Sequence, residues 1–257
     1  MMLSTIERRQ AIVDKVNESG KVDVPSLADE FSVSTVTIRT DLNDLHKKRM
    51  LVRSRGGAVA INKVARELSI KEKHTENQAI KEKLGKAVSA LIKDGDSIII
   101  DSGTTTQEVA KAIFKHENLV VMTNGLNIAS ELSKIDNIKV LMTGGTLRNK
   151  SLSFYGRQAE HSLDNLRFDK VILGVDGIEL SAGISTHFEY EAALNRIMCE
   201  RSKQIIAVTD SSKFNQAGFH IITPLESVDI LVTDSNIPRE YVEYFSQNHK
   251  KLILVDA

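Results

Sequence analysis

The hydrophobic and polar positions of the first 60 residues predict three short helices followed by a strand–turn–strand. Apolar residues recur at helical spacing over 5–19, and Gly20 follows, as is common at the C-terminal end of a helix. Pro25 suits the first turn of a second short helix, and Ser34 can cap a third helix over 35–48. The segment LVRSRGGAVAI then alternates around two glycines, which predicts a small β-wing.

From residue 78 onwards, helical and strand-like segments alternate, beginning with an amphipathic helix over 78–93. The predicted strands are 97–100, 119–122, 138–142, 170–174, 204–209, 229–233 and 252–255. Apolar strands that alternate with helices predict an open, mostly parallel α/β sheet that is buried on both faces. Residues 61–77 are charged and lack a clean period, so we interpret them as a linker, with part of it open to helix formation, between one domain at 1–60 and another at 78–257.

The composition fits a globular protein without a disulfide scaffold. The chain has 257 residues, of which 41% are hydrophobic and 26% charged, and its single cysteine is Cys199. One cysteine excludes an internal disulfide and favours a reducing compartment. No apolar run approaches the roughly 20 residues that span a membrane, and the N-terminus lacks the apolar core of a secretory signal. We therefore expect a cytoplasmic protein without membrane contact.

Positive charge is concentrated around the predicted third helix and the wing. The whole chain balances 34 Lys and Arg against 34 Asp and Glu, but residues 34–55 hold six basic and two acidic residues. Two short helices joined by a tight turn form the helix-turn-helix pattern, whose second helix enters the major groove of DNA. The alternative is a small helical cap with a solvated charged face. The wing and the local charge favour DNA binding.

One face of the third helix and the wing hold the candidates for DNA contact. Hydroxyl, amide and guanidinium groups can bind base edges and phosphates. The candidate DNA-binding residues are Ser34, Thr35, Val36, Thr37, Arg39, Thr40, Asn43, Lys47, Arg53 and Arg55.

Small polar residues follow three successive predicted strands. DSGTTT comes after 97–100, TNG after 119–122 and TGG after 138–142. In open α/β sheets ligands bind beyond the carboxyl ends of the strands, and the free N–H groups of a helix start can hold an anion. Each loop alone could be an ordinary turn, but three in succession favour a site for a phosphate or a sugar.

Later strand ends add two charged candidates. Asp176 could accept hydrogen bonds from sugar hydroxyls, and Lys213 could neutralise a phosphate or be a solvated lysine at a helix start. The chain contains neither GxxxxGK[ST] nor GxGxxG, which disfavours nucleoside triphosphates and dinucleotides. His161, His187 and Cys199 lack the spacing of metal ligands. We therefore expect neither a metal nor a cofactor.

Taken in order, these motifs resemble a known family. ERRQAIVDKV, VSTVTIRTDL and RGGA resemble the N-terminal domain of DeoR-type transcriptional regulators, and DSGTTT, MTNG, MTGG, LGVDGI and VTDSSKF resemble their C-terminal sensor domain. The resemblance implies a winged helix-turn-helix with its motif at 23–42, and a sensor domain that resembles the ribose-5-phosphate isomerase fold. It also implies a homo-oligomer, a dimer or a tetramer, that a phosphorylated sugar releases from operator DNA.

Three further segments narrow the resemblance within the family. SFYGRQAEHSL, GISTH and LNRIMCE are most similar to members that repress N-acetylgalactosamine and galactosamine utilisation. The implied effector is a phosphosugar of the N-acetylgalactosamine 6-phosphate or galactosamine 6-phosphate type. The implied effector-binding residues are Asp101, Ser102, Gly103, Thr104, Thr105, Thr106, Thr123, Asn124, Gly144, Gly145, Asp176 and Lys213.

Two alternatives to a repressor stay open at this point. One is a phosphosugar isomerase or an amino-sugar-phosphate deaminase that uses Asp176 and Glu191 as acid and base. The related isomerases use a lysine before a glycine-rich turn, but LSAG at 180–183 has none, and Glu189 or Glu191 could stand near their catalytic glutamate. The other is a DNA-architecture protein, which would have no use for the polar strand ends. We therefore expect a repressor that is not an enzyme.

Overall fold

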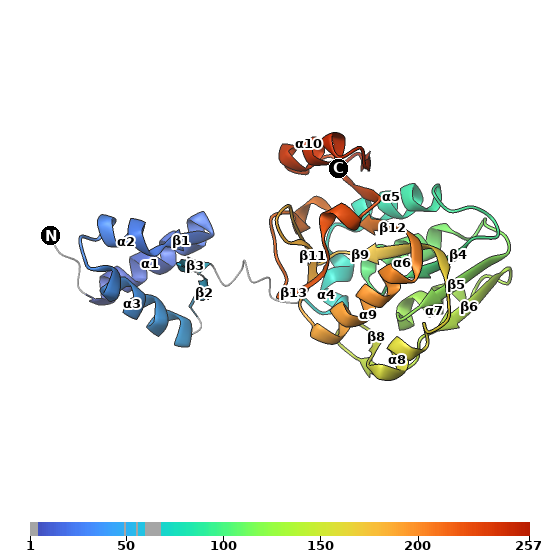
Figure 1. The fold of residues 1–257 in the computed structure, drawn as a ribbon, viewed down its shortest axis with the longest axis horizontal. Helices are drawn as coiled ribbons and strands as arrows, with labels where there is room; N and C mark the ends of the chain where they lie inside the picture. The colour runs from blue at the N-terminus through green and yellow to red at the C-terminus, as the bar shows by residue number, and fades with distance from the viewer. Residues whose placement is uncertain (1–4, 49, 55, 60–67) are drawn as a thin grey trace. The chain divides into compact units, whose positions relative to one another are not determined.

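The structure is a computed structural model of the chain. It describes residues 5–48, 50–54, 56–59 and 68–257. The chain divides into two compact units, Met1–Arg66 and Glu67–Ala257 (Figure 1). Arg55 of the predicted wing and residues 61–67 of the predicted linker lie outside the described residues. Every helix in the described part of the chain is too short or too polar to cross a membrane.

The first unit is a winged helix-turn-helix, as the sequence predicts. Its elements are α1 (Thr5–Ser19), β1 (Lys21–Asp23), α2 (Val24–Glu30), α3 (Thr35–Lys47), β2 (Val52–Ser54) and β3 (Gly57–Val59). The strands pair antiparallel in the order β1-β3-β2. The sequence analysis missed β1, because three residues are too few to show an alternating pattern. Pairing with β3 is what makes this segment a strand.

Side-chain caps and a small apolar core hold the helices of the first unit. The Asp23 carboxylate accepts a 2.8 Å hydrogen bond from the Ser26 N–H and starts α2. The Ser34 hydroxyl accepts one of 3.1 Å from the Thr37 N–H and starts α3, as its sequence position predicts. The fully buried side chains that these helices and the wing bring together include Ile12, Val16, Leu27, Ile38, Leu42, Leu45, Leu51 and Ala58.

A buried ion-pair network fixes α1 against α3. Asp41 is 1% exposed, and its two carboxylate oxygens accept hydrogen bonds of 2.7 Å from Arg8 Nε and Arg9 Nε. Arg9 also donates to the half-buried Asp44 at 2.6 Å. Because a buried charge is costly without its partner, these contacts hold α3 in one orientation on the unit.

The second unit is an α/β domain. Its helices are α4 (Ile70–Thr75), α5 (Gln78–Ser89), α6 (Thr104–Ala112), α7 (Leu126–Leu132), α8 (Arg157–His161), α9 (Glu189–Glu200) and α10 (Arg239–Gln247), with the short 3-10 turns η2 (Ser211–Lys213) and η3 (Leu225–Ser227). Its strands are β4 (Ser97–Ile100), β5 (Leu119–Thr123), β6 (Ile138–Met142), β7 (Thr146–Arg148), β8 (Ser153–Tyr155), β9 (Phe168–Gly174), β10 (Gly177–Glu179), β11 (Gly183–Thr186), β12 (Ser202–Val208), β13 (His220–Thr223), β14 (Ile230–Asp234) and β15 (Lys251–Val255).

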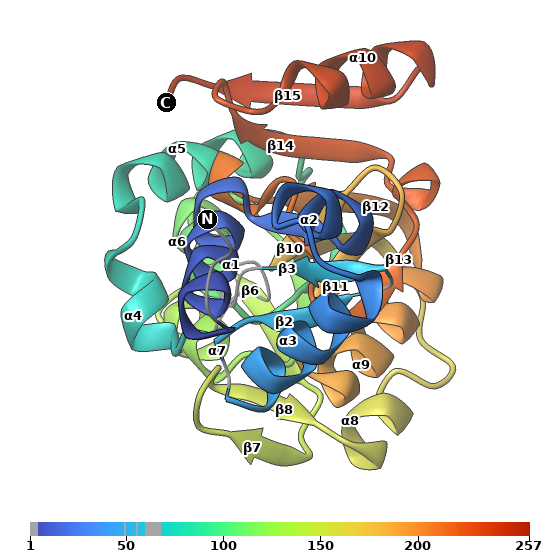
Figure 2. The same ribbon diagram turned by 90° about the vertical axis from the view of Figure 1, so that its left-hand side faces the viewer.

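Within the described residues, seven parallel strands form the central sheet in the order β15-β14-β12-β9-β4-β5-β6. The chain moves outward from β4 through β5 to β6, then returns to β9 on the other side of β4. The strand order therefore reverses between β4 and β9. In both views β15 and α10 lie at one edge of this unit (Figures 1 and 2).

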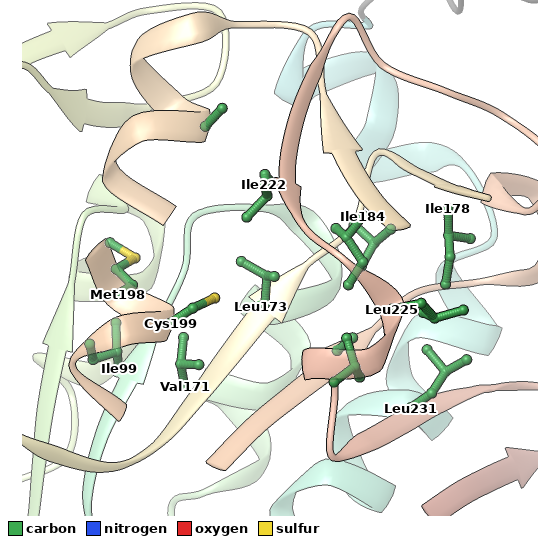
Figure 3. Close-up of a cluster of buried hydrophobic side chains, with 14 of the residues drawn as sticks. Ile99, Val171, Leu173, Ile178, Ile184, Met198, Cys199, Ile222, Leu225 and Leu231 are labelled. Atoms are coloured by element: carbon green, nitrogen blue, oxygen red, sulfur yellow. The ribbon is translucent and has the colours of Figure 1, made fainter. Parts of the chain in front are cut away.

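Helices cover both faces of the sheet, which confirms the predicted α/β class. Along β4, Ile98 and Ile100 point to the face covered by α5, α6 and α7, and Ile99 points to the other. That second face packs against α9 and the small sheet β10-β11-β13. Figure 3 shows part of this core, where Leu173 of β9 lies among side chains such as Ile184 and Ile222.

Helix α4 lies inside the segment that the sequence analysis interprets as a linker. A capping box starts it: the Ser69 hydroxyl accepts from the Glu72 N–H at 3.4 Å, and the Glu72 carboxylate accepts from the Ser69 N–H at 2.8 Å. The Ile70 N–H donates to the Lys150 carbonyl at 2.8 Å, and the Ile70 side chain is buried. This helix therefore belongs to the second unit.

Replacing Asp41 by alanine should destabilise the first unit strongly. The change leaves the buried Arg8 without its carboxylate, and breaking a buried pair in this way costs about 3–5 kcal/mol. Urea unfolding of the full chain, followed by circular dichroism, measures the loss. Asp44→Ala is the matched control, since Asp44 is more exposed and should cost about 1 kcal/mol or less. Equal losses for the two variants would contradict the assigned role of Asp41.

Candidate functional site

The outer face of α3 carries most of the predicted DNA-contact residues. Ile38, Leu42 and Leu45 of α3 are buried in the core of the unit, so the opposite face is left to solvent. Val36 is 67% exposed although it is apolar. The exposed candidates are Ser34, Thr35, Val36, Arg39, Thr40, Asn43 and Lys47, and Thr37 is half-buried. This arrangement suits a helix that reads the major groove.

The wing is held together by its own backbone and side chains. Arg53 is half-buried, and its guanidinium donates to the Gly57 carbonyl at 2.5 Å. Gly57 has no room for a side chain, because a Cβ there would lie 1.9 Å from the Val22 carbonyl oxygen of β1. Arg53 therefore stabilises the wing, whether or not it also contacts DNA.

Arg39→Ala should weaken operator binding. If its guanidinium binds a base bidentately, the loss is about 1–3 kcal/mol and is confined to the operator. If it binds only phosphate, affinity falls similarly on all sequences and the salt slope drops by about one. Fluorescence anisotropy with operator and random DNA at several salt concentrations separates these outcomes. Unchanged binding to both DNAs would remove Arg39 from the interface.

A pocket lies at the point where the strand order of the large sheet reverses. The loops after β4, β9 and β12 form its floor, and α4, α5 and α9 contribute to its walls. Its polar and charged lining residues are Lys73, Glu76, Lys81, Asp101, Ser102, Thr104, Thr105, Thr106, Ser151, Asp176, Thr186, Glu191, Asn195, Thr209, Asp210 and Lys213. Open α/β sheets bind ligands at such a reversal, because neighbouring loops there turn to opposite faces.

The structure brings together only part of the predicted effector site. Residues 101–106, Asp176 and Lys213 line the pocket, whereas Thr123, Asn124, Gly144 and Gly145 do not. The strands β5 and β6 that precede these four residues lie outward from β4, away from the reversal.

The four predicted residues that do not line the pocket have structural roles. Asn124 is fully buried, and its side-chain oxygen Oδ1 accepts a 2.8 Å hydrogen bond from the Ser102 N–H, so it positions the DSGTTT loop. The Thr123 hydroxyl accepts from the Gly125 N–H at 3.0 Å. Gly144 and Gly145, with φ of 64° and 107°, turn the chain into β7.

The start of α6 offers an anion-binding group of N–H donors. Gly103 precedes the helix with a φ of 149°, a conformation that favours glycine. Among the described residues no side chain caps α6. The N–H groups of its first turn therefore lie at the pocket without a side-chain acceptor. The buried Thr106 hydroxyl has no hydrogen-bond partner in the described part of the chain either. A phosphate placed here would meet several unused donors.

Three lysines surround the pocket. Lys73 Nζ lies 2.5 Å from Asp176 Oδ1, and Lys81 Nζ donates to the Lys73 carbonyl at 2.5 Å. Burial lowers the pKa of Lys81, although the nearby Asp210 carboxylate opposes this shift. Burial alone would raise the pKa of Asp176, but the charge and hydrogen bond of Lys73, with smaller contributions from His187 and Lys213, hold that pKa below its usual value.

The opposite part of the pocket is acidic and incompletely hydrogen-bonded. Asp101 is 3% exposed, and burial together with the Glu191 charge raises its pKa well above the usual value. Asp101 Oδ2 accepts a hydrogen bond from the side-chain amide of Asn195 at 3.3 Å. Asp101 Oδ1 and the side-chain oxygen Oδ1 of Asn195 have no partner among the described residues. The Thr186 hydroxyl lies 3.2 Å from Asp176 Oδ2 and 3.3 Å from Glu191 Oε2. Its single proton can serve only one carboxylate at a time.

Sequence reasoning missed several lining residues. Lys73 lies in the predicted linker, where the capping-box pattern SIKE was the available signal. Lys81 occupies a charged helix, and only its burial distinguishes it from its neighbours. Thr186 and Asn195 come from β11 and α9, and no local pattern indicates their place in the pocket.

Asp101→Asn should remove a pH-dependent loss of stability. Because the pKa of Asp101 is higher in the folded protein than in the unfolded chain, the free energy of unfolding falls as pH rises above the unfolded value of about 4. The amide does not titrate, so the variant should gain stability relative to wild type between about pH 4 and pH 8. Urea unfolding at both pH values measures the difference.

Asp169→Asn is the control of opposite sign. Hydrogen bonds from Ser97 and Lys203 lower the pKa of Asp169, so its carboxylate stabilises the fold above the unfolded pKa. This variant should lose stability relative to wild type as pH rises from about 2 to about 5, and its deficit should stay nearly constant from there to pH 8, because the carboxyl group is then ionised in both the folded and the unfolded chain. A loss with rising pH in Asp101→Asn as well would contradict the raised pKa.

Comparison with known proteins agrees with this architecture. Residues 8–64 match the DeoR-like helix-turn-helix domain, and residues 76–235 match the DeoR C terminal sensor domain. The chain is 45% identical over 253 residues to a protein of Escherichia coli O157:H7 named "Putative aga operon transcriptional repressor", covering 98% of this chain and 94% of that protein. It is 31% identical over 249 residues to the glycerol-3-phosphate regulon repressor of Escherichia coli K12, covering 96% and 98%.

A further similarity concerns solved structures. Ribose 5-phosphate isomerase A from Methanocaldococcus jannaschii is 15% identical, with a TM-score of 0.41 over 54% of this chain and 55% of that one.

A winged DNA-binding domain joined to an α/β domain with a polar pocket defines a ligand-responsive transcriptional regulator. The chain belongs to the DeoR family of helix-turn-helix regulators, which confirms the resemblance seen in the sequence. Its relatives are named as regulators and repressors, and this disfavours the isomerase or deaminase alternative.

Proposed function

We propose that this protein represses an operon for amino-sugar catabolism and that a phosphorylated amino sugar releases it from the operator. Support for the operon class comes from the aga operon repressor, which is similar over nearly the full length of both chains. Support for the effector class comes from the pocket. The single observation that carries the proposal is that Lys73, Lys81 and Lys213 line the same pocket as the uncapped start of α6.

The two parts of the pocket suit the two parts of such a ligand. A phosphate dianion fits the lysines and the α6 N–H groups, since both favour negative charge. Hydroxyl groups of a sugar can donate to the unpartnered oxygens of Asp101 and Asn195 and to Glu191. Buried polar atoms without partners are uncommon in folded proteins, and a bound ligand would satisfy them.

We also propose that the protein acts as a homo-oligomer, a dimer or a tetramer. A single winged domain presents a small DNA-binding surface, and helix-turn-helix proteins commonly double it through two-fold symmetry. The operator would then contain repeated half-sites.

Lys213→Ala should weaken phosphosugar binding and leave binding of the neutral sugar unaffected. Removing one cation next to a dianion should cost about tenfold or more in affinity. Calorimetric titration with galactosamine 6-phosphate, N-acetylgalactosamine 6-phosphate and their unphosphorylated forms measures both. Lys203→Ala is the matched control, because Lys203 lies near the amino end of β12, away from the pocket. Equal binding of phosphorylated and neutral sugars to wild type would refute the phosphate site.

A further inference from the structure

Helix α4 connects the pocket to the chain that leads to the DNA-binding unit. Eight residues, 60–67, separate Val59 of the wing from Leu68, which already lines the pocket. The next lining residues, Ile70 and Lys73, belong to α4 itself. Helix α4 therefore lies within a few residues, along the chain, of the segment that joins the two units.

Several contacts hold α4 and the residues after it over the pocket. At its start the Ile70 N–H donates to the Lys150 carbonyl at 2.8 Å. Beyond its end the Asn77 amide donates to Asp210 Oδ1 at 3.1 Å. These contacts secure both flanks of the helix, and neither places a charge of α4 in the pocket.

The ion pair between Lys73 and Asp176 places a charge of α4 in the pocket. Its two residues are 103 positions apart in the chain, and both line the pocket. Their side chains are 24% and 22% exposed, so the pair is partly open to solvent and an entering ligand could contact it. Asp176 is also connected to Glu191 through the Thr186 hydroxyl, which lies within hydrogen-bond distance of both carboxyl groups.

We propose that Lys73 exchanges partners on effector binding, an inference that rests on the phosphosugar function proposed above. In the free protein Lys73 pairs with Asp176 and holds α4 in the geometry that favours operator binding. In the complex the phosphate takes Lys73 from Asp176, since a dianion attracts the ammonium more strongly than one carboxylate does and also repels that carboxylate. The pull on α4 then changes, and α4 is the first helix of the second unit after the connection to the DNA-binding unit.

The exchange supplies what an allosteric switch requires. A ligand shifts an equilibrium only by its difference in affinity for the two states. Here the difference is local and identifiable, because the state with the Lys73–Asp176 pair competes directly with the state that binds phosphate. Both residues act through α4, and the helix is already contiguous with the segment between the units.

Two variants of the full-length protein test the exchange. They should change the affinity for the phosphosugar differently and lower the affinity for operator DNA alike. Lys73→Ala removes the pair and a phosphate partner, whereas Asp176→Asn weakens the pair and keeps Lys73 for the phosphate. Lys71→Ala, on the exposed side of α4, is the matched control. Calorimetry with galactosamine 6-phosphate and anisotropy with an operator duplex selected from random DNA give the two affinities, and circular dichroism checks folding.

The expected result has three parts. Without sugar, Lys73→Ala and Asp176→Asn both bind the operator more weakly than wild type, by about tenfold. Lys73→Ala also binds the phosphosugar about tenfold more weakly, while Asp176→Asn binds it at least as tightly as wild type. Lys71→Ala retains the wild-type values for both ligands.

Two other results overturn the inference in distinguishable ways. If both variants bind the operator as wild type does, and the phosphosugar still releases them by the wild-type factor, the partner exchange is refuted while the proposed function stands. If wild type binds no phosphosugar, the proposed function is refuted, and the exchange falls with it.

Discussion

The reversal of strand order between β4 and β9 is the constraint on which the rest of the second unit depends. Parallel strands need crossover connections, and these leave β4 and β9 toward different faces of the sheet. The two loops therefore separate and leave a pocket between them. Asp101 follows β4 directly and Asp176 comes two residues after β9, so the two loops bring both carboxyl groups to the pocket. The rest of these two loops and several neighbouring elements supply the other lining residues.

The charges in the pocket are mutually dependent. Burial and the nearby Glu191 charge raise the pKa of Asp101, whereas the charge and hydrogen bond of Lys73 hold the pKa of Asp176 below its usual value in spite of burial. Two carboxyl groups on neighbouring strands thus have opposite tendencies, set by their surroundings. In an enzyme such a pair suits acid–base catalysis. In this regulator the same arrangement makes the pocket sensitive to any ligand that brings a new charge beside Lys73.

The sequence predicts local features well and long-range ones poorly. The Ser34 cap and the turn in DSGTTT each follow from a short sequence pattern. The structure has the cap at the start of α3 and the turn at the start of α6, as expected. The order of the strands is not written in any local pattern, so three polar loops on successive strands look equivalent in the sequence. The structure separates them, because β5 and β6 lie outward from β4. The bounds of helix α4 could not be placed within the linker, which the sequence allows to be partly helical, since six residues show no clean helical period. Asn195 reaches the pocket only through packing of α9.

The two units solve the burial of charge differently, and the difference matters for regulation. In the first unit Asp41 is enclosed by two arginines, and no ligand could reach it without unfolding the helix contacts. That network therefore favours one rigid arrangement of α1 and α3 whether or not a ligand is present. In the second unit the Lys73–Asp176 pair is partly exposed within a pocket, so a competing anion can replace one partner without disturbing the core. A regulator needs both kinds of contact: a reading surface that keeps its shape, and a bond near the connection between the units that a small anion can break.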